Sequence, residues 1–232
     1  MKYLINYADG CCREARFHNS VSGLQQGFDS VIQWNRTDLD DSFLEETKDI
    51  INQKRGAGYW IWKPYVIRKT LEMVNQNDIV FYSDAAAVFI RDMNPIFDAI
   101  IQNDIIGFEL AGHHKEGVWT RKSCIQKIGL DPETTRHTDQ RMASFIGIKN
   151  CERSRNIIDE YLSFCKIPDM VLDLEEDSPL EEFKEHRHDQ SVWSLITKKH
   201  DVEIIPDPTQ WGIKHQQSTE NDFYINHHRN KV

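Results

Sequence analysis

The chain has 232 residues, of which 39% are hydrophobic, and this is enough to bury the core of one large domain. Its 37 acidic residues outnumber 28 basic ones, and the formal net charge of -9 argues against nucleic acid as the main partner, because neutralising phosphates requires a basic surface. No run reaches the roughly 18 apolar residues of a membrane span, the N-terminus lacks a signal peptide's apolar stretch, and five irregularly spaced cysteines suit reduced thiols. We therefore expect a cytoplasmic protein with no membrane span, as a monomer or a weak homodimer.

Apolar runs and turn signals alternate along the first half of the chain. The elements that they predict are a strand at 2–8, a strand at 30–34, a helix at 41–56 capped by Asp41 or Ser42 and ended by Gly56, a helix from Pro64 to Val74, a turn at 75–78 and a strand at 79–82. Pro64 suits the first turn of its helix, because its missing N–H would have no helical partner there.

The second half continues the alternation. Its predicted elements are a helix from Asn94, a strand at 104–108, a helix at 120–128, a strand at 143–149, a helix at 154–165 and a strand at 202–206. The acid-rich stretch 171–190 is interpreted as a solvated loop, with a capping box at 178–181. Strands and helices in this rhythm predict a single α/β domain with a mainly parallel central sheet flanked by helices.

Asp84 follows the apolar strand 79–82 and is itself followed by three alanines, residues 85–87. Ligands of open α/β sheets bind beyond the carboxyl ends of the strands, so a carboxylate there suits a metal or a ribose. The alternative is a helix cap, but no helix start follows directly, and Asp92 or Asn94 is the better cap of the next helix. Small side chains beside the acid leave room for a ligand.

Three segments resemble nucleotide-sugar-dependent glycosyltransferases of the GT-A fold. GYWIWKPYVIRKTLEMVNQNDIVFYSDAAAVF (58–89) is similar to their donor-binding segment, with an aromatic and basic helix, a turn, and a strand ending in an Asp-x-Asp-type motif. ASFIGIKN (143–150) resembles the strand under the acceptor site, and HRHDQSVWSLI (186–196) resembles the Asp-Gln helix start near the donor sugar. The similarity is to small capsule- or surface-glycan transferases and, more distantly, to retaining galactosyl- and glucosyltransferases.

The resemblance implies one Rossmann-like GT-A domain over residues 1–232, with a donor-binding half at about 1–110 and an acceptor and catalytic half at about 111–232. It implies a hexosyltransferase that moves a hexose from a UDP-sugar to a glycan or other hydroxyl acceptor with the help of a divalent metal. A retaining mechanism is slightly favoured over an inverting one.

The metal expectation rests on a departure from the family's motif. Ala86 stands where the second aspartate would be, so Asp84 has to hold the metal with help from elsewhere. FYINHHRNK (223–231) matches the place where such enzymes often supply a histidine, which makes His227 or His228 the second candidate ligand. Mn²⁺ tolerates imidazole and Mg²⁺ prefers oxygen, so Mn²⁺ or Mg²⁺ is expected. The alternative for this segment is a flexible polar tail.

Donor-binding residues are expected around the same edge. A leaving diphosphate needs its developing charge neutralised, and the candidate cations are Lys63, Lys214, Arg229 and Lys231. The remaining candidates are Tyr7, Ala8 and Asp9 for the base, Trp62 beside Lys63, and Ser83, Asp84, Ala85 and Ala86 at the strand end. Core packing is the alternative for Trp62, and a plain strand-to-turn junction is the alternative for residues 7–9.

Asp189 and Gln190 are the catalytic candidates. On the resemblance, the acid and the amide face the anomeric carbon, as a general base in an inverting enzyme or as stabilisers of an oxocarbenium-like state in a retaining one. The alternative for Asp189 is a helix N-cap. HTDQ (137–140) contains a second Asp-Gln pair, so Asp139 is the second candidate base.

Two rival functions remain open. A sugar nucleotidyltransferase shares the sheet and the metal-binding acids, although the N-terminal part of the sequence contains no Gly-rich phosphate loop followed by a basic cluster. A catalytically inactive module that binds a nucleotide sugar or a glycan could use the same aromatic residues, and loss of the second motif aspartate fits such a module.

Overall fold

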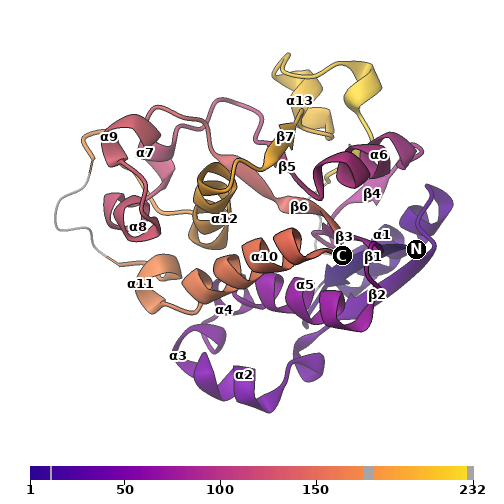
Figure 1. Ribbon diagram of the computed structural model, residues 1–232, viewed down its shortest axis with the longest axis horizontal. Helices are drawn as coiled ribbons and strands as arrows, with labels where there is room; N and C mark the ends of the chain where they lie inside the picture. The colour runs from indigo at the N-terminus through magenta and orange to yellow at the C-terminus, as the bar shows by residue number, and fades with distance from the viewer. Residues whose placement is uncertain (11, 175–179, 229–232) are drawn as a thin grey trace.

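A computed structural model describes residues 1–10, 12–174 and 180–228. A six-stranded sheet with the order β2-β1-β3-β6-β5-β7 forms the centre, and a two-stranded sheet, β4-β8, lies beside it (Figure 1). The strands are β1 (Lys2–Tyr7), β2 (Ser30–Trp34), β3 (Ile79–Ser83), β4 (Val88–Phe89), β5 (Ile105–Glu109), β6 (Arg141–Lys149), β7 (Glu203–Ile205) and β8 (Ile225–Asn226). Within the central sheet only β6 runs against its neighbours, so the predicted single α/β domain with a mainly parallel sheet is confirmed.

Helices follow nearly every strand, as the alternation in the sequence predicts. They are α1 (Arg13–Gln25), α2 (Asp41–Glu46), α3 (Lys48–Ile51), α4 (Gly56–Tyr59), α5 (Trp62–Met73), α6 (Asn94–Asn103), α7 (Glu116–Trp119), α8 (Lys122–Ile128), α9 (Pro132–Thr135), α10 (Glu152–Cys165), α11 (Pro168–Val171), α12 (His188–Lys199) and α13 (Gln210–Lys214). No helix in the described part of the chain is both long and apolar enough to cross a membrane.

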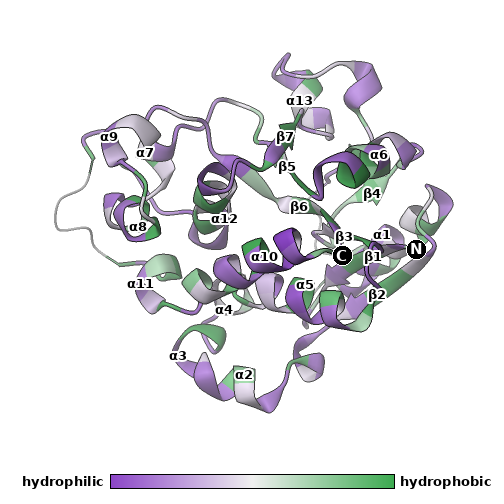
Figure 2. Ribbon diagram, in the orientation of Figure 1, coloured by the Kyte–Doolittle hydropathy of each residue, from purple (hydrophilic) through white to green (hydrophobic). Residues whose placement is uncertain are grey.

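The sheet separates two apolar cores. Side chains alternate between its faces, so Val80 and Tyr82 of β3 pack toward α5, α10 and α12, whereas Ile79 and Phe81 pack with α6 and the segment after α1. Every residue of β3 is buried, because helices cover both faces of this central strand. In Figure 2 one side of α6 is hydrophobic and the other hydrophilic, as expected of a helix with one face on the sheet.

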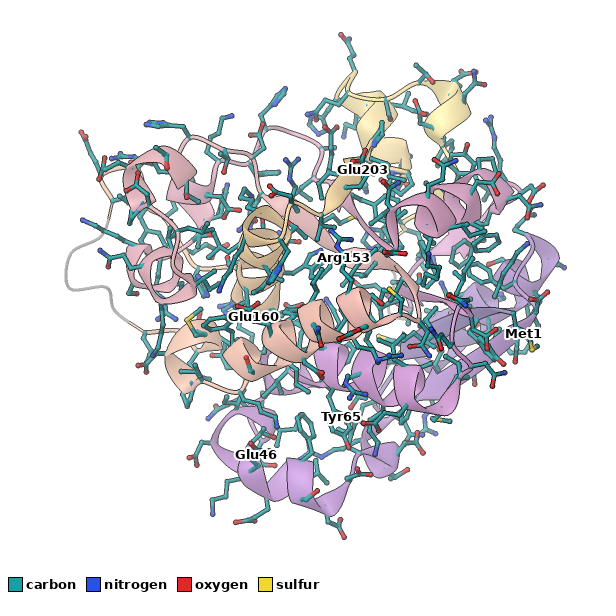
Figure 3. The ribbon with its side chains drawn as sticks, viewed as in Figure 1. Met1, Glu46, Tyr65, Arg153, Glu160 and Glu203 are labelled. Carbon is teal, nitrogen blue, oxygen red and sulfur yellow. The ribbon has the colours of Figure 1, made fainter. Side chains whose placement is uncertain are left out.

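Helices α10 and α12, which cover the same face of the sheet, are tied together at the surface. Glu160 of α10, labelled in Figure 3, pairs with Lys199 of α12 at 2.6 Å and also contacts His200. Helix α12 is thereby fastened at its C-terminal end, and its N-terminal end projects to the carboxyl edge of the sheet.

The prediction of a single helix at 41–56 is wrong. The chain forms α2 and α3 with a break at Thr47, whose hydroxyl donates to the carbonyl oxygen of Phe43 at 2.7 Å. The N-cap of α2 is Asp40, not Asp41 or Ser42, and the Asp40 carboxylate accepts from Lys69 at 2.8 Å.

Gly56 does not end a helix either. It opens a run in which residues 56–60 all have positive φ, at 57°, 50°, 100°, 50° and 58°. A left-handed conformation costs about 1–2 kcal/mol for each residue with a Cβ, so this turn is strained at Ala57, Tyr59 and Trp60. At Gly58 a Cβ would lie 2.6 Å from the Cα of Ile51, which requires glycine there. Strain of this kind gathers at functional sites.

Other helix ends differ by small amounts from the predictions. Helix α8 begins at Lys122 and not at Thr120, and α6 begins at Asn94 as predicted, with Met93 as its N-cap and the Asp92 carboxylate accepting from the Asn94 N–H at 3.0 Å. Residues 178 and 179 of the predicted capping box lie outside the described residues.

Candidate active site

The carboxyl ends of β1 and β3 lie at the same edge of the sheet. The two strands are parallel with Ile5 opposite Tyr82, so Tyr7 and Asp84 each come two residues after that pair. A pocket of about 550 Å³ opens at this edge. Five of the predicted site residues line it together: Lys63, Asp84, Asp189, Gln190 and His227.

Lys63 forms the centre of the polar base of this pocket. Its side chain comes from the first turn of α5 and is only 3% exposed. The ammonium nitrogen lies 2.7 Å from Oδ2 of Asp189 and 3.8 Å from Oδ1 of Asp84. Three segments far apart in the sequence therefore join one cation to two carboxylates.

Two buried tyrosines hold the carboxylates. The Tyr82 hydroxyl donates to Oδ1 of Asp84 at 2.7 Å, and the Tyr161 hydroxyl donates to Oδ2 of Asp189 at 3.3 Å. Burial and the neighbouring carboxylates raise the pKa of both tyrosines well above the usual value. Both hydroxyls therefore remain protonated donors, and they fix the orientation of the acids.

Opposing effects set the protonation of the central pair. Burial acts to lower the pKa of Lys63, but the charges of Asp189 and Asp84 outweigh it, and the pKa is raised. Burial raises the pKa of Asp189 above its usual value, and Lys63 offsets this only in part. Lys63 keeps its proton, and a buried charge of this kind requires the partners that it has.

Asp189 is not the N-cap of α12. The N-cap is Arg187, and Asp189 lies in the first helical turn with its side chain directed to Lys63 and Tyr161. The apolar residues predicted to point inward, Val192, Trp193, Leu195 and Ile196, are all fully buried. The helix thus packs by its apolar residues and delivers Asp189 to the pocket.

The residues predicted for the base lie near the pocket but do not line it. Tyr7 is buried and stacks on Trp62 with the ring centroids 3.9 Å apart, so one face of each ring is occupied by the other. Trp62 therefore packs in the core, the alternative that the sequence left open. Ala8 is buried and Asp9 is exposed at the end of β1. Their contact with a base stays a prediction.

The remaining predicted site residues lie outside the pocket wall. Asp139 pairs with Lys115 at 2.9 Å, His228 does not line the pocket, and Lys214 is exposed over the Trp211 ring. Ser83, Ala85 and Ala86 belong to the strand end next to Asp84, and Ser83 is fully buried. Arg229 and Lys231 lie outside the described residues.

Comparison with known proteins identifies the architecture. Neither a family model nor a curated protein sequence matches the chain. Mouse xyloside xylosyltransferase 1 in its apo form is similar with a TM-score of 0.53 at 10% identity, over 99% of this chain and 98% of that one. The galactosyltransferase LgtC, solved with donor and acceptor sugar analogs, is similar with a TM-score of 0.50 at 11% identity, over 98% and 87% of the two chains. The chain has the GT-A fold.

In this GT-A fold the residues at the pocket suit a metal only incompletely. The carboxylate of Asp84 and the imidazole of His227 are donors that Mn²⁺ accepts, and both line the pocket. Within residues 1–10, 12–174 and 180–228 no group of three or more His, Cys, Asp or Glu side chains could share a metal. Two donors do not complete the coordination shell of Mn²⁺ or Mg²⁺, so metal binding stays a prediction.

Sequence reasoning missed one wall of the pocket. Arg55 pairs with Asp173 at 3.0 Å, the Tyr59 hydroxyl donates to Asp173 at 2.7 Å, and Trp60 stacks on His188 at 5.7 Å. The strained turn at 56–60 carries the Trp60 ring to the pocket. The two glycines flanking Ala57 were the available signal, because paired glycines mark backbone that other residues adopt poorly.

Proposed function

We propose that this chain is a glycosyltransferase that moves a hexose from a UDP-sugar to a hydroxyl of a glycan or other acceptor with retention of configuration. The observation that carries the proposal is the buried cation Lys63 between Asp84 and Asp189, at the carboxyl edge of a GT-A sheet and at the base of a pocket. Fixed and oppositely charged groups of this kind bind sugar hydroxyls and respond to charge that develops during the reaction.

Asp84 and the alanines after it would receive the donor. Asp84 has Tyr82 and Lys63 near Oδ1, so Oδ2 is the oxygen suited to the ribose or to a metal. Ala86 follows with a small side chain, and this leaves space along the strand end for the diphosphate. Asp84 and His227 would hold Mn²⁺, which would supply positive charge to the departing diphosphate.

Asp189 and Gln190 would act at the sugar. Oδ2 of Asp189 already has the Lys63 ammonium at 2.7 Å and the Tyr161 hydroxyl at 3.3 Å, so this oxygen is occupied and is poorly placed to take a proton from an acceptor. An amide is no base at all. This favours a retaining reaction, in which the C1–O bond to the diphosphate breaks, the acceptor oxygen bonds to C1 on the same face, and the acceptor's proton passes to the departing phosphate oxygen. Asp189 and the Gln190 carboxamide would stabilise the positive charge on the sugar.

The test is product analysis with a panel of UDP-sugars, with and without Mn²⁺ and EDTA. Release of UDP supports the proposal, release of pyrophosphate indicates a nucleotidyltransferase, and binding without turnover indicates an inactive binding module. Asp84→Ala should abolish Mn²⁺-dependent UDP binding, and His227→Ala should weaken it. Asp98→Ala on the exposed side of α6 is the control and should bind UDP normally. UDP affinity that is indifferent to EDTA and to Asp84→Ala would refute the site.

A further inference from the structure

Gln140 is a buried amide directly beneath the pocket. It precedes β6, is 0% exposed and does not itself line the pocket. Its Nε2 lies 3.0 Å from the Ser191 hydroxyl, 3.1 Å from the Thr120 hydroxyl and 3.3 Å from the carbonyl oxygen of Trp119. On its other side, Oε1 lies 2.8 Å from Nε2 of Gln190, whose side chain does line the pocket.

The partners of Gln140 decide which of its two amide atoms faces them. The Trp119 carbonyl can only accept. Ser191 already donates its single hydroxyl proton to that carbonyl at 2.8 Å, so toward Gln140 it can only accept as well. Three acceptors require a donor, and the amide nitrogen of Gln140 must therefore face them.

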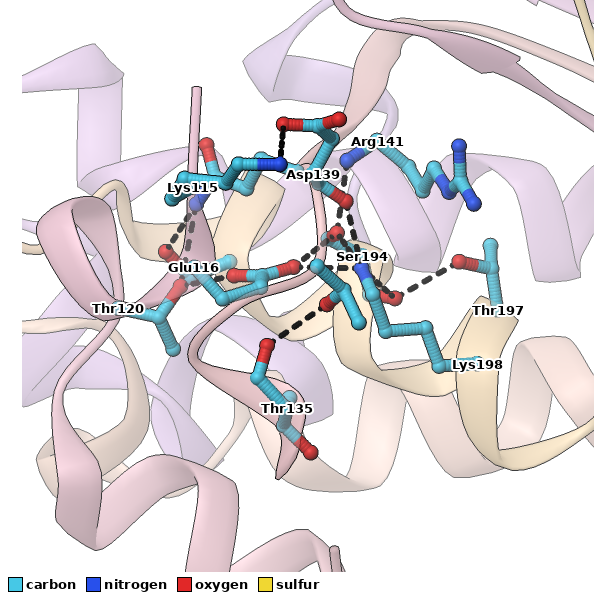
Figure 4. A network of polar contacts seen from close by, with 12 residues as sticks. Lys115, Glu116, Thr120, Thr135, Asp139, Arg141, Ser194, Thr197 and Lys198 are labelled. Carbon is cyan, nitrogen blue, oxygen red and sulfur yellow. Dashed lines mark hydrogen bonds and ion pairs between the residues drawn. The ribbon is translucent and has the colours of Figure 1, made fainter. Parts of the chain in front are cut away.

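The third acceptor is anchored by a buried charge. The Thr120 hydroxyl donates to the carboxylate of Glu116 (Figure 4). Its oxygen is therefore left to accept from Gln140. Glu116 is 0% exposed, pairs with Lys198 at 2.7 Å and accepts from the Ser194 hydroxyl. A carboxylate cannot donate, and this fixes the direction of every bond that follows it.

The direction of these hydrogen bonds also determines how Gln190 is oriented at the pocket. Because Gln140 uses its nitrogen on Ser191 and Thr120, it can offer only its oxygen to Gln190. Gln190 must answer with its own nitrogen, which turns its Oε1 away from Gln140. The hydrogen-bond partners thus determine which atom of the Gln190 amide is the oxygen and which is the nitrogen.

We propose that Gln140, anchored through Thr120 on Glu116, is a positioning residue that holds the Gln190 carboxamide with its oxygen toward the reacting sugar. This rests on the proposed glycosyl transfer for its chemical meaning. An amide oxygen stabilises positive charge at C1, whereas an NH₂ group in its place would oppose that charge. The hydrogen bonds from Glu116 through Thr120 and Gln140 to Gln190, called the relay below, fix the direction of the Gln190 oxygen before any substrate binds.

Gln140→Met tests the relay, because methionine has a similar length and neither donates nor accepts as an amide does. We expect turnover to fall about tenfold to a hundredfold, with the UDP dissociation constant unchanged. Gln140→Glu should be milder, because a carboxyl group among three acceptors keeps its proton and can donate as the amide does. Side-chain NH₂ signals of Gln190, assigned by their loss in Gln190→Glu, should exchange faster with solvent in Gln140→Met than in the wild type.

Asn150→Leu is the matched control. Asn150 is a buried amide at the far end of β6 that donates to three backbone carbonyls, so its loss tests destabilisation without touching the pocket, and turnover should stay normal. Unchanged Gln190 NH₂ exchange in Gln140→Met would overturn the inference whatever the activity. Equal losses of turnover in Gln140→Met and Asn150→Leu would also overturn it. No turnover by the wild type would instead overturn the proposed function, while the exchange rates still decide the orientation.

Discussion

The chain contains two Asp-Gln pairs, and the fold uses them in opposite ways. In Asp189-Gln190 the acid is buried against Lys63, and both side chains line the pocket. In Asp139-Gln140 the acid pairs with Lys115, with a third of its side chain exposed, and the amide is the buried member. The two pairs meet, since Gln190 donates to Gln140. On the proposed reaction the second pair supports the first and does not compete with it for the catalytic role.

The two Asp-Gln pairs have the same sequence but different surroundings, so the dipeptide alone does not determine where its side chains lie. Asp189 lies in the first turn of a helix whose apolar side packs on the sheet, so its side chain is delivered to the carboxyl edge. Asp139 precedes β6, the strand that runs antiparallel to its neighbours, and its backbone bridges to Lys115 instead.

The largest effect is expected from Asp189→Asn. Removing a fixed group that stabilises charge in the transition state typically costs about a hundredfold to a thousandfold in rate, so turnover should fall by at least the lower figure, with UDP affinity nearly intact. Steady-state kinetics and calorimetric UDP titration measure both quantities. Normal glycosyl transfer by this variant would move the catalytic role to Gln190 or Asp139 and erase the contrast.

The next effect concerns the two lysines. Lys63→Met leaves buried carboxylates without their cation, so the free energy of unfolding should fall by about 3–5 kcal/mol. Lys115→Met removes an exposed partner and should cost about 1 kcal/mol or less. Denaturant unfolding measures both. In the Asp189→Asn background the cost of Lys63→Met should shrink, and an unchanged cost there would show that the pair does not interact.

A third prediction contrasts the titration of the two acids. Burial raises the pKa of Asp189 above the usual value near 3.9, whereas at Asp139 Lys115 and His113 outweigh burial and lower it. Asp189 therefore favours folding most below the usual pKa, and this contribution is lost as pH rises through the raised pKa. Asp139 contributes above the usual pKa, and its contribution is lost as pH falls through the lowered pKa. Carboxyl ¹³C titration measures both groups, and an Asp189 that titrates below Asp139 would contradict the prediction.

The smallest effect is expected from Asp139→Asn. Its side chain does not line the pocket, and its partners are at the surface, so turnover should stay within about twofold and stability within about 1 kcal/mol. The same kinetic and unfolding measurements apply. A loss as large as that of Asp189→Asn would mean that the two pairs share the chemistry.

Much of the fold could be predicted from the chain's local patterns. The run at 79–82 is apolar throughout because helices cover both faces of β3, and the prediction of a central strand is confirmed. The helix at 41–56 was predicted too long, because apolar spacing carries no sign that the backbone leaves helical geometry at Thr47, where φ is -110° and ψ is 16°. The left-handed turn at 56–60 also escaped prediction, since only tertiary packing makes Tyr59 and Trp60 adopt it.

The site was predicted by residue type more than by contact. Asp84, Asp189, Gln190, Lys63 and His227 were all expected, and one pocket collects them. Gln140 was not singled out, because an interior glutamine carries no local signal and its partners Thr120, Gln190 and Ser191 are 20 to 51 residues away.

By itself the sequence determined the alternation of strands and helices and the placing of acids at a strand end and a helix start, because both follow from periodicity and local backbone preference. Tertiary structure alone decided that Lys63 pairs with Asp189 across 126 positions and that Gln190 donates to Gln140 across 50. Charge pairing and hydrogen-bond direction depend on atoms within about 3 Å, and only the packing of α5, β3, β6 and α12 brings those atoms together.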